Sequence, residues 1–163
     1  MLDVKSFSRS LKSIWIKKYL DNENSGKWKL FYYYLKEHGG KFIFTGNLDT
    51  TDIKHLHLKD VFLLEILQIW TELNFQENPQ HFQSSTIWNN SLIRVGGTPV
   101  LYPRWSKNSV NFVKDLLDDS SHFLSYAAFT QKYKFYPNFL EYYGLVAAVR
   151  DFKVKCNTAI VVS

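Results

Sequence analysis

The feature that most constrains the fold is a segment, residues 61–73, in which apolar side chains recur every three or four positions. At this spacing they share one face of a helix, and such a face needs a core to cover it. The side chains concerned are Leu63, Leu67, Trp70 and Leu73. Asp60 stands just before the segment, where its carboxylate can accept hydrogen bonds from the first backbone N–H groups of a helix. The loop-forming run ENPQ follows at 77–80. The pattern predicts a core helix from Val61 to Leu73.

Similar patterns, bounded by capping and turn residues, predict the other helices. We expect them at residues 5–20, 28–37, 109–117, 126–133 and 138–150. Gly39 and Gly40 end the helix at 28–37, because glycine readily adopts the left-handed conformation that closes a helix. Ser125 is positioned to cap the helix at 126–133.

Two segments predict β-structure. The run KFIF at residues 41–44 is expected to be a short strand, turned by Gly46 and Asn47. The runs LIRV and PVLY flank Gly96 and Gly97, which favours a small β-hairpin. The expected fold is therefore mostly α (α+β): a single helical domain of about six helices with one short strand and a small hairpin.

Composition is consistent with this fold and limits the compartment. A chain of 163 residues with 45% hydrophobic and 17% aromatic residues can bury a substantial core. Its one cysteine, Cys156, excludes an internal disulfide and a cysteine-based zinc cluster, and suits a reducing intracellular compartment, nuclear or cytoplasmic. No targeting signal is seen, and no apolar run approaches the roughly 20 residues that span a bilayer. We therefore expect no membrane association.

Basic and aromatic residues alternate in the first 34 positions of a chain whose net charge is +5. Cations of this kind can neutralise phosphates, and neighbouring rings can stack on bases. The candidate nucleic-acid-binding residues are Lys5, Arg9, Lys12, Lys17, Lys18, Lys27, Trp28 and Lys29, with Trp15 as a further stacking candidate. An alternative stays open, in which the tryptophans belong to the core and the lysines form a solvated surface.

No catalytic, metal or cofactor site is predicted. The pair Asp118 and Asp119 resembles the metal-binding carboxylates of polymerases, but the apolar pattern before it places the pair in a solvated turn at the end of a helix, not on a hairpin. His55 and His57 lack a third metal ligand nearby. The Gly96 turn lacks the lysine and the helix start of a phosphate-binding loop. We therefore expect the chain not to be an enzyme.

The order of the segments carries a family resemblance over about residues 6–150. The segments are SLKSIWIKKYLD, GKWKLFYYYL, FLLEILQIWTELNF, TIWNNSLIRVGGTPVLYPRWSKNSVNFVKDLLDD, FLSYAAFTQKYKF and NFLEYYGLVAAV. Their succession resembles the region just C-terminal to the reverse transcriptase core of LINE-type non-LTR retrotransposon polyproteins. The resemblance implies a helical thumb or connection-like domain at residues 1–150, with residues 151–163 as a disordered or unrelated tail.

The resemblance also implies a function. The parent protein would be an RNA-directed DNA polymerase whose catalytic aspartates lie upstream, and this region would be a noncatalytic fragment that assists RNA or DNA binding beside the polymerase core. Two alternatives stay open. One is a protein-interaction module that docks on the polymerase core or another partner through an exposed aromatic patch, around Tyr32 to Tyr34 or around Tyr142 and Tyr143. The other is a relic open reading frame without present function.

Overall fold

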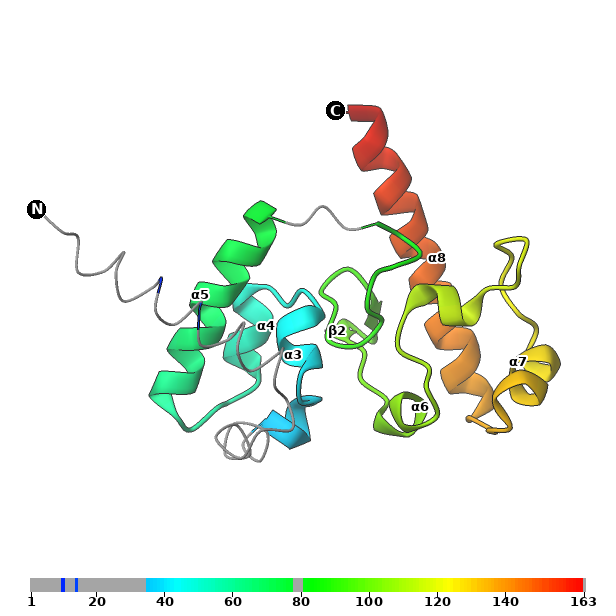
Figure 1. Cartoon of the computed structure of the whole chain (residues 1–163), viewed down its shortest axis with the longest axis horizontal. Helices are drawn as coiled ribbons and strands as arrows, with labels where there is room; N and C mark the ends of the chain where they lie inside the picture. Colours follow the sequence, from blue (N-terminus) through cyan, green and yellow to red (C-terminus); the bar gives the residue numbers. More distant parts are fainter. Residues whose placement is uncertain (1–9, 11–13, 15–34, 78–80, 163) are drawn as a thin grey trace, which may run out of the picture. The chain divides into compact units, whose positions relative to one another are not determined.

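The computed structural model of the chain describes residues 10, 14, 35–77 and 81–162, and their side chains except those of residues 73–77 and 158–162. The chain divides into two compact units, residues 1–79 (unit 1) and residues 80–163 (unit 2). The expectation of a mostly helical fold with one small hairpin is confirmed (Figure 1). The boundary expected at residue 150 marks no break in the structure, because a helix runs through it.

The described part of unit 1 is a small helical assembly built on α5 (Val61–Glu77). It contains the 3₁₀ helix η1 (Lys36–His38), α3 (Phe42–Thr45) and α4 (Thr50–His55), and both of these α-helices pack against α5. The Asp60 carboxylate accepts hydrogen bonds from the backbone N–H groups of Phe62 (2.9 Å) and Leu63 (3.3 Å), so the predicted cap of α5 is confirmed. Leu63 and Leu67 of the predicted stripe are buried.

The strand predicted for residues 41–44 is wrong: the segment forms α3. Ile43 and Phe44 are adjacent in sequence, yet both are buried, at 3% and 1% exposure. In a strand, neighbouring side chains point to opposite faces, whereas a helical turn can bury both on one side. The Trp70 indole N–H fixes the turn by donating to the Phe44 carbonyl oxygen. An apolar run of four residues does not distinguish the two structures by periodicity.

The end predicted at Gly39 is confirmed, although the helix expected at residues 28–37 lies mostly outside the described residues. Gly39 closes η1 with φ of 94°, and Gly40 follows with φ of 57°. Only glycine adopts such angles at little cost, which is why the chain turns here.

Unit 2 begins with long connections around a two-stranded hairpin. Strand β1 (Arg94–Val95) pairs in antiparallel fashion with β2 (Thr98–Pro99), and Val95 lies opposite Thr98. Gly96 and Gly97 form the turn with φ of 65° and 84°, as in the two-residue turns that suit the twist of a hairpin. The predicted hairpin is therefore confirmed.

The helices of unit 2 follow the hairpin. They are α6 (Pro103–Lys107), the 3₁₀ helix η2 (Val113–Leu116), α7 (Tyr126–Tyr133) and α8 (Phe139–Val162), and α8 packs against β1. Helix α7 has the predicted bounds and the predicted cap, since the Ser125 Oγ accepts a hydrogen bond from the Ala128 N–H (3.1 Å).

Two predictions for unit 2 are wrong. The helix expected at 109–117 is reduced to η2, because the backbone on both sides of Phe112 bonds elsewhere: the Asn111 carbonyl accepts from the Ile87 N–H, and the Val113 N–H donates to the Ser85 carbonyl. While the alternative of an unrelated tail stays a prediction, the disorder expected from residue 151 is the second: α8 continues to Val162. Phe152 accounts for this, because its side chain is fully buried and its ring lies 5.8 Å from that of Phe82.

Candidate nucleic-acid interface

The residues predicted from sequence to bind nucleic acid lie outside the described residues, so their role stays a prediction. They are Lys5, Arg9, Lys12, Lys17, Lys18, Lys27, Trp28 and Lys29, together with Trp15. The alternative docking residues Tyr32 to Tyr34 also fall outside. The described residues nevertheless contain a second group of cations that the sequence analysis did not single out.

Positive charge is concentrated in unit 2. Residues 80–163 contain nine Lys and Arg against five Asp and Glu, a net charge of +4, whereas residues 1–79 contain eleven against ten, a net charge of +1. Four exposed cations of unit 2 lie on α6 and around the end of α7, and we call them the basic face. They are Arg104, Lys107, Lys132 and Lys134.

Local structure determines how these four side chains are presented. Arg104 and Lys107 are three residues apart on α6, so they lie on the same side of that helix. Lys132 is in the last turn of α7, and Lys134 ends that helix in the left-handed conformation, with φ of 51° and ψ of 37°. The chain therefore leaves the helical path at Lys134.

Aromatic contacts bring α6 and the end of α7 together. Trp105, buried to 1% exposure, lies with its ring 5.9 Å from that of Phe135. The Arg104 guanidinium carbon lies 5.5 Å from the Phe135 ring centroid, and the Lys132 Nζ lies 5.2 Å from that of Tyr133. Cations held over aromatic faces are attracted to the ring quadrupole, so their positions are partly fixed.

Negative charge does little to offset the basic face. None of its four cations has an ion pair with another residue of the described part of the chain. The carboxylate that approaches α6 is that of Glu141, which is half-buried and lies 3.5 Å from the Trp105 indole nitrogen. Burial, and to a lesser degree this carboxylate, raises the pKa of Tyr102. The face is therefore able to attract an anionic ligand.

The support beneath the basic face is an aromatic core. The Trp105 ring lies 5.2 Å from that of Phe129 and 6.2 Å from that of Tyr142. Burial, with a smaller effect of Tyr143, raises the pKa of Tyr142 to about 12 despite the opposing effect of Arg150. Burial, followed by the Asp115 carboxylate, likewise raises the pKa of Tyr133 to about 12.

Both of these hydroxyl groups therefore stay protonated at neutral pH and donate to backbone oxygens, that of Tyr142 to Leu124 and that of Tyr133 to Asp115. The first links α8 to the segment between η2 and α7, and the second links α7 to η2, so these two tyrosines hold the support in place.

Helix α8 exposes an apolar group that we call the α8 patch: Phe139 (56% exposed), Leu140 (78%) and Tyr143 (48%). The Phe139 and Tyr143 rings are in contact, with centroids 4.4 Å apart. Of the two tyrosines predicted for a docking patch, Tyr143 is exposed and Tyr142 is buried to 1%. Adjacent residues of a helix point about 100° apart around its axis, so Tyr142 can face the core while Tyr143 faces solvent.

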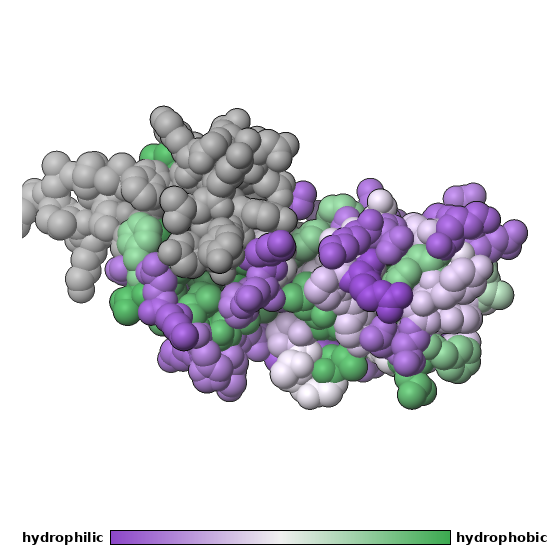
Figure 2. All heavy atoms as spheres, turned by 90° about the horizontal axis from the view of Figure 1, so that it is seen from below, coloured by the Kyte–Doolittle hydropathy of each residue, from purple (hydrophilic) through white to green (hydrophobic). Residues whose placement is uncertain are grey.

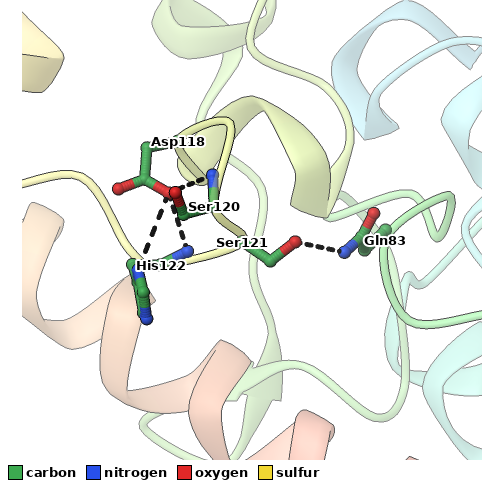
Figure 3. A network of polar contacts seen from close by, with 5 residues as sticks. All are labelled: Gln83, Asp118, Ser120, Ser121 and His122. Carbon is green, nitrogen blue, oxygen red and sulfur yellow. Dashed lines mark hydrogen bonds and ion pairs between the residues drawn. The ribbon is translucent and has the colours of Figure 1, made fainter.

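The loop that carries Asp118 and Asp119 differs from the predicted helix end. Leu117 and Phe123 pair as an antiparallel bridge, so the two aspartates lie in a tight connection between paired residues. Figure 3 shows the Asp118 carboxylate accepting from the N–H groups of Ser120 (2.8 Å) and His122 (2.9 Å). The carboxylate therefore organises its own loop, which is a local role typical of aspartate.

Other candidate chemistry is equally local. The His55 Nδ1 lies 2.7 Å from the Thr51 carbonyl oxygen at the end of α4, and His57 has a left-handed backbone with φ of 49°. Burial raises the pKa of the Cys156 thiol, which lowers its reactivity. Over residues 35–77 and 81–162, no three His, Cys, Asp or Glu side chains come together as metal ligands would.

A signal for the basic face was present in the sequence. The run KYKFY at residues 132–136 alternates cations with rings, as the N-terminal region does. The contribution of α6 could not be seen in this way, because Arg104 joins the group through the long-range contact between Trp105 and Phe135. Figure 2 shows the side of unit 2 that carries α6 and the start of α8. Hydrophilic and hydrophobic side chains are mixed on this side.

No protein-family model, curated protein or solved structure matches the chain. Among the helices in the described part of the chain, none combines the length and the apolar character needed to cross a membrane.

Proposed function

We propose that the chain is a noncatalytic nucleic-acid-binding module that acts beside the polymerase core of a non-LTR retrotransposon. The observation that supports this best is the basic face: four exposed cations from two helices, with no ion pair inside the described part of unit 2. Cations left unpaired on a rigid support favour a polyanionic ligand, because displaced counterions add to the free energy of binding.

The ligand of this face is the phosphate backbone of RNA or DNA. Backbone contacts position a protein on nucleic acid without reading its sequence, which is what an accessory region of a polymerase requires. In this proposal the N-terminal cations from Lys5 to Lys29 also bind phosphates, and no cofactor takes part. The chain itself then has no polymerase or nuclease activity, and primer extension by the purified chain with Mg²⁺ would contradict this.

A binding measurement tests the proposal. The triple variant Arg104→Gln, Lys132→Gln, Lys134→Gln removes three charges of the basic face, and we expect on the order of tenfold or more weaker binding of labelled RNA and DNA at low salt. The matched control is Lys36→Gln, Lys54→Gln, Lys59→Gln, which removes three exposed cations from unit 1. Equal losses for the two variants would show that net charge matters and the basic face does not.

The α8 patch favours a second candidate, a module that docks on the polymerase core. Three large apolar side chains exposed side by side are unfavourable in water unless a partner covers them. Leu140 is the most exposed of them, so Leu140→Lys would place a charge in such an interface. We expect this variant to lose binding to a purified non-LTR polymerase core in calorimetry while keeping its affinity for oligonucleotides. Unchanged calorimetry would contradict docking through this patch.

A further inference from the structure

We propose that Tyr136 is a stacking platform for an unpaired base, so that the ligand of the basic face is a single strand and not a duplex. This inference rests on the proposed function and adds the class of nucleic acid to it. It is based on the surroundings of the Tyr136 side chain, which differ from those of every other tyrosine in the described residues.

The Tyr136 ring packs against no other aromatic ring in the described part of the protein. Its side chain is 73% exposed. The other five tyrosines of the described residues each pack a ring against another aromatic ring, and they are Tyr102, Tyr126, Tyr133, Tyr142 and Tyr143. Tyr136 makes no ring contact and no hydroxyl hydrogen bond with any described residue. Its aromatic faces are therefore available to a ligand.

The backbone that carries Tyr136 is firmly held. Phe135 on one side is buried to 6% exposure, with its ring packed against those of Trp105 and Phe129. Pro137 on the other side is also buried, and its carbonyl oxygen accepts a hydrogen bond from the Tyr126 hydroxyl (2.8 Å). A ring displayed between two anchored residues loses little conformational entropy when it binds, since its position is largely set beforehand.

Two cations of the basic face adjoin the segment that carries this ring. Lys134 is two residues before Tyr136, and Arg104 lies over the ring of Phe135, the residue between them. Single-strand-binding surfaces combine cations with exposed aromatic rings, with phosphates on the cations and bases on the rings. In a duplex the bases already stack on one another and offer no free face, so stacking on Tyr136 selects an unpaired strand.

The test compares three variants on oligonucleotides labelled at one end: a 15-residue dT strand, a 15-residue U strand and a 15-base-pair duplex. We expect Tyr136→Ala to weaken binding of both single strands by about 5-fold to 100-fold, as loss of one stacked base predicts, and to leave the duplex affinity within twofold. Tyr136→Phe keeps the ring and should bind like the wild type. Tyr143→Ala removes another exposed ring, from the α8 patch, and should have no effect.

The outcomes separate this inference from the proposed function. If the Arg104, Lys132 and Lys134 variant loses affinity and Tyr136→Ala does not, the basic face binds phosphates alone and the stacking inference is wrong. If neither variant loses affinity, both proposals are wrong. Equal losses of Tyr136→Ala on strand and duplex would also overturn the inference, and thermal melting of the variant checks that its fold is intact.

Discussion

The two units bury different kinds of side chain. The core of unit 1 is largely aliphatic, with Ile53, Ile66 and Leu67 at 1% exposure or less. The largest fully buried side chains of unit 2 are aromatic: Trp88, Trp105, Phe129, Tyr142 and Phe152. Unit 2 also carries a net charge of +4, against +1 for unit 1.

The aromatic side chains explain how a unit with little regular structure is held together. An aliphatic core depends on helices that present continuous apolar faces, as α3, α4 and α5 do. A buried Trp or Tyr also donates a hydrogen bond, so it can hold a connecting segment in place. The Trp88 indole N–H donates to the Val110 carbonyl (2.9 Å), and the Tyr126 hydroxyl to that of Pro137 (2.8 Å). The aromatic core of unit 2 therefore fixes its connections, and with them the exposed cations.

The largest difference between the two units is expected for the variant Trp105→Ala. Trp105 contacts five other rings, so its removal should lower the free energy of unfolding of unit 2 by about 3 to 5 kcal/mol. Hydrogen exchange measured residue by residue should show lost protection at 85–157 and retained protection at 43–72. Equal loss in both regions would mean that the aromatic core does not stabilise unit 2 separately.

High pH should also distinguish the units. The raised pKa values of Tyr133 and Tyr142, about 12, mean that the folded state favours the protonated hydroxyls. Their contribution to stability is therefore present below the unfolded value of about 10 and is lost as the pH rises from 10 to 12. We expect the denaturation midpoint of unit 2 to fall over this range, and to fall less in the double variant Tyr133→Phe, Tyr142→Phe. An identical pH profile for that variant would show that other groups cause the loss.

A smaller effect concerns the hairpin turn of unit 2. Gly96 has φ of 65°, and a Cβ there would meet nothing within 4 Å, so Gly96→Val costs backbone strain and no steric clash. We expect a loss of roughly 1 kcal/mol or more. The control is Gly144→Ala in α8, where the new Cβ would lie at an ordinary 3.9 Å from Val95 and should stabilise the helix by about 0.5 to 1 kcal/mol. Melting temperatures that shift in the same direction would contradict the turn geometry.

The smallest effect is expected in unit 1, at the cap of α5. Asp60→Ala removes the acceptor for the N–H groups of Phe62 and Leu63 and should cost about 1 kcal/mol. Asp60→Asn keeps an acceptor oxygen and should lose much less, as chemical denaturation can measure. Equal losses for the two variants would indicate that the charge of Asp60, and not the cap, is what matters.

Local chemistry made part of this fold predictable. Asp60, Ser125 and Gly96 act through backbone groups within three residues, so their roles could be predicted from sequence. The errors arose where distant contacts decide the conformation. Residues 42–45 form a helix because Trp70 and the aliphatic core hold it, and residues 109–112 are not helical because they bond to residues 85–87.

The candidate site, too, has a part that could be predicted from sequence and a part that depends on distant contacts. The pattern KYKFY was visible in the sequence, but the exposure of Tyr136 and the burial of Phe135 depend on Trp105, some 30 residues away. Alternating cations and rings indicate a binding surface only once the packing shows which rings are buried. The proposed class of interaction could therefore be inferred from sequence, whereas the residues of unit 2 proposed to carry it could not.

The salt dependence of binding shows whether the basic face contacts phosphates. If four or more cations contact phosphates, the logarithm of the binding constant for a 15-residue single strand should fall with the logarithm of salt concentration at a slope of roughly −3 or steeper. The variant Arg104→Gln, Lys132→Gln, Lys134→Gln should flatten the slope by about two to three units, because each lost phosphate contact removes about 0.7 to 0.9. The same slope for this variant and the wild type would contradict nucleic-acid binding by the basic face.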